Sequence, residues 1–489
     1  MVFKEILNVL KLKGNNIAYT INQEKYTYNQ LYMFVSNIYN WLLDKNLNKK
    51  PVIVYGHKEV YMKASFLACS LAGMPYVPID ESLPRERVES IISQTQSELI
   101  IGDFEYNNIY FISKKEINEV MIDDVYTEIE EIYCKSDDIC YMIFTSGSTG
   151  IPKGVKVTYG NLDSCIKWLK QFACSEENII LNQALFSFDL SVADLYLSLV
   201  SNGEHFILDS RVQLDFKLLF ENLKSSNATI AVVTPSFIDF LLLDKSFNKD
   251  LMPNLKTIIF CGEKLLSSTV KNIYSRFGEE IKIINCYGPT ECTFAVTSIE
   301  ISVEMANNND IPIGKTKKDV DIYIIDEELN KLDDGDIGEI LIVGDSVADG
   351  YVNIEQNDNF IMYNNKKAYR TGDLGYLKND VLYYKCRKDK QLKYKGYRIE
   401  LDDIENNIYK LDYIEKVVIV CKVAEEEKVQ KIIAFVKLKE DILKKSLEIR
   451  EDLTKILPNY MCPVIKIVKE FPLNQNGKCD KKKLLEEYC

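Results

Sequence analysis

A polar, glycine-rich stretch between two short apolar runs constrains the fold more than any other part of the chain. It reads Thr145-Ser146-Gly147-Ser148-Thr149-Gly150-Ile151-Pro152-Lys153-Gly154, with apolar runs at 141–144 and 155–159 on its flanks. Such flanks predict a loop between two strands. Glycines let backbone N–H groups approach an anion, and the hydroxyls and Lys153 add donors and positive charge. The stretch therefore predicts a phosphate-binding loop, and it is not a Walker loop because Gly154 follows Lys153.

Strand and helix patterns alternate through the N-terminal part of the chain. Residues 52–55 and 76–80 predict strands, and residues 61–72 predict a helix between them. Thr27 is predicted to cap a helix that runs to about Leu43, and Asn161 to cap a helix that reaches Phe172. The mainly acidic residues 114–138 predict a solvated connector. The alternation is typical of α/β layers around a largely parallel sheet.

Length, charge and cysteine usage exclude several classes of protein. A chain of 489 residues predicts two or three folded units, and its net charge of −13 argues against a nucleic-acid partner. Its 13 cysteines form no CxxC pair, and with only His57 and His205 beside them a zinc site is not expected. No apolar run reaches about 18 residues and no signal peptide opens the chain, so we expect a reduced, cytoplasmic protein that is not membrane-embedded.

Further motifs extend the pattern over almost the whole chain. They lie at 76–80, 181–194, 233–237, 260–265, 285–291, 369–375, 386–391, 396–400 and 472–478. In this order and spacing, and together with the predicted phosphate loop, they resemble the adenylate-forming superfamily, which includes acyl-CoA synthetases, nonribosomal peptide synthetase adenylation domains and D-alanine–carrier protein ligases. The resemblance implies an α/β fold, with a large multi-layer N-terminal adenylation domain over residues 1–388 and a small α+β C-terminal lid domain over residues 389–489.

The resemblance also implies one reaction, in which an acid and ATP form an acyl-adenylate and the acyl group then passes to a thiol. Attack of a carboxylate on the α-phosphorus brings negative groups together, so the site needs cations and fixed donors. By the resemblance, Lys478 is needed for adenylate formation. Glu291 is expected to hold Mg²⁺, and Thr290 to donate to the α-phosphate. The C-terminal domain is expected to rotate about the hinge residue Asp389 between the two half-reactions.

The nucleotide is expected to contact a wider set of residues. Tyr287 is expected to cover the adenine, Asp373 to accept the ribose hydroxyls, and Arg387 to add positive charge. The other predicted ATP-binding residues are Thr145, Ser146, Gly147, Ser148, Thr149, Gly150, Lys153, Gly262, Glu263, Lys264, Asn285 and Gly288. Taken singly, each acidic residue in these motifs has an alternative interpretation as a turn or cap carboxylate.

Asp189 distinguishes an amino-acid substrate from a plain acid. In the amino-acid-activating members of the superfamily, an aspartate after Ser-Phe pairs with the substrate ammonium, because burying that charge unpaired costs several kcal/mol. Asp189 has the alternative role of capping the helix that begins at Leu190, and the two roles can coexist. The other predicted substrate residues are Leu190, Ala193, Cys261, Cys286 and Phe294.

The pocket residues resemble most those of the D-alanine–carrier protein ligases, which place a cysteine at the position of Cys261. Two positions depart, because Ala193 replaces a usual methionine and Phe294 replaces a small aliphatic residue. One wall loses volume while another gains it, so the pocket shape is expected to change. We therefore predict a small amino acid, first D-alanine, as the substrate. A separate carrier protein with a phosphopantetheine arm is the expected acceptor, since Cys489 follows Lys478 closely.

Four other functions are alternatives to this prediction. A stand-alone nonribosomal peptide synthetase adenylation enzyme for another amino acid would share every catalytic motif. An acyl- or aryl-CoA ligase is disfavoured by Asp189. An aminoacyl-tRNA synthetase is disfavoured by the acidic composition and by the absence of its signature motifs. A non-catalytic binding protein is disfavoured because Lys478, Glu291 and Asp373 are all retained.

Overall fold

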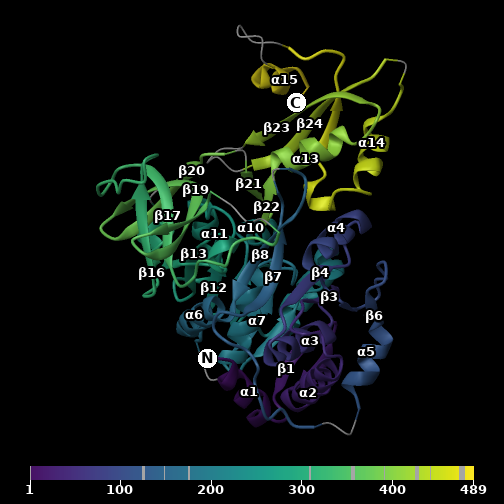
Figure 1. Ribbon diagram of the computed structural model, residues 1–489. Coiled ribbons are helices and arrows are strands. Elements are labelled where there is room, and N and C mark those ends of the chain that lie inside the picture. Colours follow the sequence, from purple (N-terminus) through teal and green to yellow (C-terminus); the bar gives the residue numbers. More distant parts are fainter. Residues whose placement is uncertain are drawn as a thin grey trace. The chain divides into compact units, whose positions relative to one another are not determined.

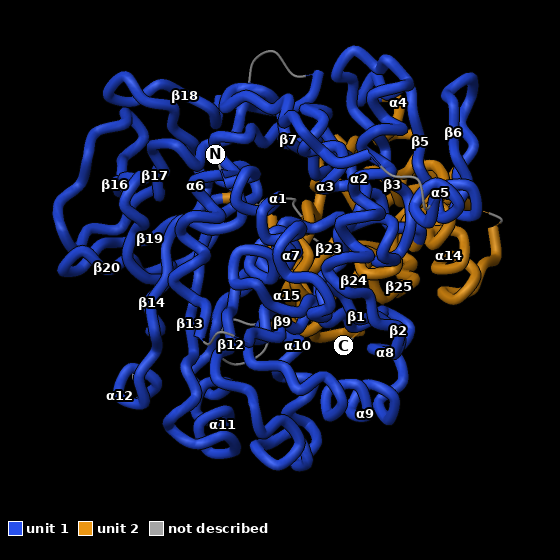
Figure 2. Tube along the Cα trace, turned by 90° about the horizontal axis from the view of Figure 1, so that it is seen from below, with its two compact units in different colours: residues 1–81, 94–144, 154–388 blue, residues 82–93, 145–153, 389–489 orange. Residues whose placement is uncertain are grey.

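The computed structural model describes residues 2–123, 127–147, 149–174, 177–307, 310–353, 358–389, 391–423, 429–440, 442–472 and 479–488. The chain divides into two compact units, which are drawn in different colours in Figure 2. Unit 1 comprises Met1–Glu81, Gln94–Phe144 and Gly154–Lys388, and unit 2 comprises Ser82–Ser93, Thr145–Lys153 and Asp389–Cys489.

The largest sheet of unit 1 is built mainly of parallel strands, some of which are labelled in Figure 1. Its strands pair in the order β15 (Lys315–Thr316), β14 (Thr297–Glu300), β13 (Lys282–Tyr287), β12 (Thr257–Phe260), β11 (Ile230–Val233), β9 (Ile179–Asn182), β10 (Glu204–Ile207), β1 (Ile17–Ile21) and β2 (Glu24–Thr27). The strands from β13 to β1 are parallel, and antiparallel strands flank them. β11 and β12 are entirely buried, as expected of a parallel sheet covered on both faces. In such sheets, ligands bind outside the carboxyl ends of the strands.

A second sheet of unit 1 contains the strands that flank the predicted phosphate loop. Its order is β6 (Tyr110–Ile112), β5 (Leu99–Ile101), β3 (Val52–Gly56), β4 (Tyr76–Asp80), β7 (Ile139–Thr145) and β8 (Lys153–Thr158). α3 (Val60–Ala72) links β3 to β4 and is buried along its whole length. The predicted strands at 52–55 and 76–80 and the predicted helix at 61–72 are confirmed.

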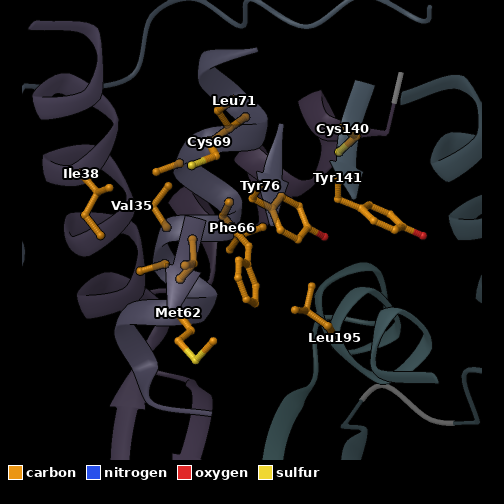
Figure 3. Packing of buried hydrophobic residues seen from close by; sticks show 14 of the residues in the cluster. Val35, Ile38, Met62, Phe66, Cys69, Leu71, Tyr76, Cys140, Tyr141 and Leu195 are labelled. Carbon is orange, nitrogen blue, oxygen red and sulfur yellow. The ribbon is translucent and has the colours of Figure 1, made fainter. Parts of the chain in front are cut away.

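Aromatic side chains join this second sheet to α7 (Leu190–Val200), the helix that follows Asp189 (Figure 3). The ring of Phe66 stacks on that of Tyr76, with centroids 4.6 Å apart, and the ring of Tyr76 lies 5.5 Å from that of Tyr141. Leu195 of α7 belongs to the same buried cluster. The helix that begins at the predicted substrate site is therefore part of the core.

A third sheet of unit 1 is antiparallel and carries two of the predicted nucleotide residues. Its strands are β16 (Val320–Ile325), β17 (Gly338–Gly344), β19 (Lys366–Lys378) and β18 (Phe360–Tyr363), and β20 (Val381–Arg387) pairs with β19. Asp373 of β19 lies opposite Arg387 of β20 in this register.

The remaining helices of unit 1 include two for which the sequence predicted a capping residue. They are α1 (Phe3–Leu12), α2 (Tyr28–Asp44), α5 (Lys114–Met121), α6 (Tyr159–Leu169), η1 (Lys170–Phe172), α8 (Ser210–Leu214), α9 (Phe216–Ser226), α10 (Pro235–Leu241), α11 (Ser267–Phe277), η2 (Thr290–Cys292) and α12 (Val303–Ala306). Thr27 caps α2, as predicted. The prediction for Asn161 is right only in part: Thr158 is the N-cap of α6, and the Asn161 side chain completes the capping box by accepting from the Thr158 N–H, at 2.9 Å. The Asn161 amide also donates to the Asp345 carbonyl, at 2.7 Å.

The predicted solvated connector at 114–138 is wrong over the residues that the structure describes. Ser113 and Glu116 form a capping box at the start of α5, and Ile117 and Met121 of this helix are buried. Further along, Ile129 is buried as well. The apolar residues recur at helical spacing and pack against unit 1, while the acidic residues between them face solvent.

Unit 2 has its own small core. It contains the hairpin β21 (Gln391–Tyr394) and β22 (Tyr397–Glu400), the sheet β23 (Ile414–Val423), β24 (Val429–Leu438) and β25 (Val464–Ile467), the helices α13 (Leu401–Tyr409), α14 (Ser446–Leu453), η4 (Asn459–Met461) and α15 (Lys481–Tyr488), and most of α4 (Arg85–Thr95). Ile404 and Ile408 of α13 pack with Ile432 of β24 in this core. None of the described helices in either unit has the length and apolar content needed to cross a bilayer.

Unit 1 also buries a group of polar and ionisable side chains around α7, which we call the buried polar cluster: Lys58, Lys63, Asn182, Asp194 and His205. Lys63 and His205 are fully buried, and the Lys63 ammonium lies 3.5 Å from Nδ1 of His205. Lys58 donates to the carbonyls of Gln183, at 2.9 Å, and Leu208, at 2.8 Å. Burial lowers the pKa of Lys63 to about 7 and that of Lys58 to about 8, while the charge of Asp194 opposes both changes.

Replacing Lys63 with methionine is expected to remove a pH dependence of stability. The folded pKa of about 7 lies below the model-peptide value of 10.5, so the unfolded chain binds more protons between these values. The contribution of Lys63 to the free energy of unfolding therefore becomes more favourable as the pH rises across this window. This contribution is lost as the pH falls through the window. Thermal midpoints should be measured at about pH 7 and about pH 9.5. The midpoint of wild type should increase relative to that of Lys63→Met between the lower and the higher pH. Lys217→Met on exposed α9 is the control, and a pH-independent difference between wild type and Lys63→Met would contradict the prediction.

Candidate active site

Asp373 is the centre of a buried hydrogen-bonded group in unit 1. The Tyr287 hydroxyl donates to its Oδ2 at 2.6 Å, and the Arg387 guanidinium donates to its Oδ1 at 2.9 Å. Arg387 also donates to the Thr371 carbonyl, at 2.8 Å. Burial, together with the charge of Asp373, holds the pKa of Tyr287 well above its usual value, so the phenol remains a donor. Because each carboxylate oxygen has more than one lone pair, Asp373 retains the capacity to accept ribose hydroxyls.

Glu291 lies in η2, immediately after the turn that ends β13. Its side chain is 1% exposed, and the Tyr351 hydroxyl donates to Oε1 at 2.6 Å. The turn is tight, because a Cβ on Gly288 would lie 2.6 Å from Cα of Ala295. Thr290, also in η2, is buried. This turn places a buried carboxylate and a hydroxyl next to each other at the carboxyl end of β13.

The residues around Glu291 fit a magnesium ion but not a metal held by protein ligands alone. Among the described residues, no group of three or more His, Cys, Asp or Glu side chains is arranged to hold a metal. Mg²⁺ commonly takes one or two carboxylates and completes its shell with phosphate oxygens and water. Glu291 fits this pattern as the single carboxylate, and a bound ion would neutralise charge on the phosphates.

Other predicted nucleotide residues follow β12 or lie in β13. Glu263 accepts from the Ser236 backbone N–H, at 2.9 Å, in the first turn of α10, and Gly262 precedes it while Lys264 is exposed. The buried Asn285 side chain donates to the Pro312 carbonyl, at 2.8 Å. The amide of Asn285 therefore holds the backbone segment at Pro312 against β13.

The predicted phosphate loop joins β7 to β8, which confirms the strand–loop–strand prediction. Thr145 ends β7 and Lys153 begins β8. The Ser146 hydroxyl donates to the Arg398 carbonyl at 2.8 Å and accepts from the Glu400 N–H at 3.2 Å, both in β22.

The rest of this loop is described only in part. A Cβ on Gly147 would lie 2.1 Å from the Ile151 carbonyl oxygen, so the loop requires glycine there, while Thr149 is exposed and Gly150 partly so. Two predicted residues, Ser148 and Lys478, lie outside the described residues. The predicted hinge residue Asp389 accepts from the Gln391 N–H at 3.1 Å.

Asp189 directly precedes α7, and its side chain makes no capping hydrogen bond. The capping alternative for Asp189 is therefore wrong. Burial raises the pKa of the Cys165 thiol to about 12; the charge of Lys317 opposes this change, and the nearby charge of Asp189 adds to it. Asp189 contributes in the same way, after burial, to the raised pKa of Tyr141. The carboxylate thus lies near the buried, uncharged side chains of Cys165 and Tyr141, where an ammonium partner would be favourable.

The predicted pocket residues come together in one buried cluster of unit 1, which we call the pocket cluster. It contains Leu190, Ala193, Cys261, Cys286 and Phe294, each less than 8% exposed. Burial holds the pKa of the Cys286 thiol well above its usual value, so this wall is uncharged.

Two aromatic residues of the pocket cluster were missed in the sequence. The Trp168 ring lies 6.5 Å from the Phe294 ring and packs edge-on against Phe172 at 5.0 Å. Together with Cys165, these residues recur at helical spacing along α6 and η1, a pattern typical of any core-facing helix. No sequence signal distinguishes them from ordinary core residues.

Comparison with known proteins establishes the family. Residues 8–352 match the model of the family described as AMP-binding enzyme, and residues 403–478 match that of the AMP-binding enzyme C-terminal domain. The chain belongs to the AMP-binding enzyme family. It is an adenylate-forming ligase that uses ATP, which confirms the resemblance found in the sequence.

Curated relatives and solved structures match nearly the whole chain. The D-alanine–D-alanyl carrier protein ligase of Bacillus licheniformis is 38% identical over 99% of both chains, and that of Listeria monocytogenes serotype 4b is 40% identical over 92% of both. The Vibrio cholerae adenylation domain AlmE, solved in complex with glycyl-adenosine-5'-phosphate, matches with a TM-score of 0.83 at 22% identity, over 99% of this chain and 97% of that one. PA1221, an NRPS protein containing adenylation and PCP domains, matches with a TM-score of 0.84 at 21% identity, over 99% and 84% of the two chains. These matches confirm the predicted fold class.

Proposed function

We propose that this enzyme activates D-alanine with ATP as an aminoacyl-adenylate and transfers it to the phosphopantetheine thiol of a separate carrier protein. The observation that carries the proposal is a carboxylate, Asp189, next to a buried cluster with small residues on its wall. Asp189 would pair with the substrate ammonium, and Ala193 and Cys261 would contact the side chain. The names of the relatives at 38% and 40% identity support D-alanine and a carrier protein.

The proposed roles on the nucleotide side follow the geometry of unit 1. Asp373, held by Tyr287 and Arg387, would accept the ribose hydroxyls. Thr290 would donate to the α-phosphate and Glu291 would hold Mg²⁺. These groups would stabilise charge that builds up on the phosphate during attack.

Two further elements complete the proposal. The predicted phosphate loop would bind the triphosphate, and Lys478 would bring a positive charge to the reacting oxygens. A division into domains at residues 388 and 389, with Asp389 as the hinge, is part of the same proposal. The use of ATP and the free state of the described cysteines favour the predicted cytoplasmic location.

The experiment that tests the proposal is amino-acid-dependent ATP–pyrophosphate exchange with D-alanine, L-alanine, glycine, L-serine and L-cysteine. Exchange dominated by D-alanine is the expected result. A preference for another amino acid would favour the second candidate, a stand-alone adenylation enzyme for that amino acid. The departures at Ala193 and Phe294 favour this candidate, because they change the shape of the pocket wall. No exchange with any amino acid would overturn both.

Replacing Phe294 with alanine is expected to admit larger substrates. Phe294 is 1% exposed in the pocket cluster, and Trp168 packs near it, so the ring has little freedom to move aside. Removing the ring should raise kcat/KM for D-valine relative to D-alanine by about tenfold or more, since one methylene group in an apolar pocket is worth about 10- to 200-fold. Alanine is chosen because the backbone at Phe294 has a positive φ of 71°, which a β-branched residue does not tolerate. Phe277→Ala, in a different buried cluster of unit 1, is the control. An unchanged ratio of the two substrates in Phe294→Ala would contradict the prediction.

A further inference from the structure

The segment that carries Asp189 is anchored upstream by the buried polar cluster. Asn182 ends β9, and its side-chain amide donates to the Ala184 carbonyl at 3.1 Å. Lys58 donates to the carbonyl of Gln183, between these residues, at 2.9 Å. The chain is therefore fixed where it leaves the large sheet, a few residues before Asp189.

The same cluster anchors the segment downstream through Asp194 of α7. The Asn182 amide donates to Oδ2 of Asp194 at 2.9 Å, and Nε2 of His205 lies 2.9 Å from Oδ1. Because the Lys63 ammonium faces Nδ1 of His205, Nε2 is the nitrogen that carries the proton and donates to Asp194. Both oxygens of this fully buried carboxylate are thus held by residues of the large sheet.

Asp189 lies midway between the two anchored points, with no capping hydrogen bond of its own side chain. Leu190 and Ala193, which belong to the pocket cluster, are on α7 near Asp194. A rotation of α7 by about 20° would move its Cβ atoms by about 1 Å, given the radius of an α-helix. A misplacement of about 1 Å at a reacting centre can cost about 100-fold in rate.

We propose that Asp194 is a positioning residue for the amino-acid site, where its contacts with Asn182 and His205 fix the rotation of α7 and thereby the place of Asp189. This inference rests on the proposed function, because it concerns the amino acid that Asp189 would bind. It assigns the buried polar cluster a role in substrate binding. If the cluster served stability alone, disrupting it would change the KM for the amino acid and the KM for ATP equally.

The test is Asp194→Asn in the full-length enzyme, measured by ATP–pyrophosphate exchange. The amino acid is the one that wild type uses fastest among D-alanine, L-alanine, glycine, L-serine and L-cysteine. The asparagine keeps the volume but presents an NH₂ group to one of its two donors, so one contact is lost. We expect the KM for the amino acid to rise about tenfold and the KM for ATP to stay within about twofold. His205→Gln retains a donor to Asp194 and should keep the amino-acid KM within about threefold of wild type.

Asn37→Ala is the control for a purely structural effect. Asn37 is also buried in unit 1 and donates to the carbonyls of Met121 and Asp123, neither of which belongs to α7. Its thermal midpoint should fall with both KM values unchanged. An equal rise of both KM values in Asp194→Asn, or an amino-acid KM no higher than in Asn37→Ala, would overturn the role of Asp194 while leaving the proposed function intact. A wild type without amino-acid-dependent exchange would instead overturn the proposed function, and this inference with it.

Discussion

Asp189→Asn is expected to lower kcat/KM for the amino acid by about 1,000-fold, since breaking a buried charge pair costs about 3–5 kcal/mol. The asparagine has nearly the same volume, so the loss comes from the missing charge. The substrate ammonium would then be buried beside a neutral amide and among the neutral thiols of the pocket cluster. Exchange kinetics with varied amino acid and saturating ATP measure the effect.

The KM for ATP should stay within about twofold in Asp189→Asn, because the variant leaves the nucleotide residues unchanged. Asp215→Asn is a matched control, since Asp215 directly precedes another helix of unit 1, α9, and caps it through its side chain. Asparagine caps helices as well as aspartate does, so this control should behave as wild type. Equal losses with amino acid and ATP in Asp189→Asn would show that the carboxylate does not bind the ammonium.

Local patterns in the sequence were sufficient for the strands and for the loop between β7 and β8. The runs at 52–55 and 76–80 are apolar and short, and their burial in the second sheet follows directly. The order in which the strands pair could not be predicted from them, because it depends on contacts between distant segments. The prediction for Asn161 placed the N-cap three residues too late for a local reason. Thr158 and Asn161 are both good capping residues, and the two side chains form one capping box.

The candidate site was predictable where a residue carries charge or follows a strand. Asp189, Glu291 and Asp373 are polar residues inside motifs, and the structure places each of them in unit 1. Trp168 has no such signal, because an apolar residue on a helix face is most often part of the core. Lys63 was also beyond prediction, since lysine is almost never fully buried without a partner and composition alone places it at the surface. What surrounds Trp168 and Lys63 can be seen only in the folded structure.

Glu291→Gln is expected to lower kcat/KM for adenylate formation by about 100-fold or more, because it removes the carboxylate charge that would hold the proposed Mg²⁺ ion. Glutamine keeps the volume and can still accept a hydrogen bond from Tyr351. The variant should therefore fold as wild type does. Exchange measured against increasing Mg²⁺ at fixed ATP should show a higher Mg²⁺ requirement, and partial recovery at high concentration.

Tyr351→Phe separates the charge of Glu291 from its placement. It removes the hydroxyl that donates to Oε1 at 2.6 Å and leaves the carboxylate in η2. A hydrogen bond to a charged group is worth about 1.5–3 kcal/mol, so this variant should lose about 10- to 100-fold, less than Glu291→Gln. Its Mg²⁺ requirement should stay closer to that of wild type, because the charge that attracts the ion is still present. An unchanged Mg²⁺ dependence in Glu291→Gln would mean that the ion is held elsewhere, and that the buried carboxylate serves the turn after β13.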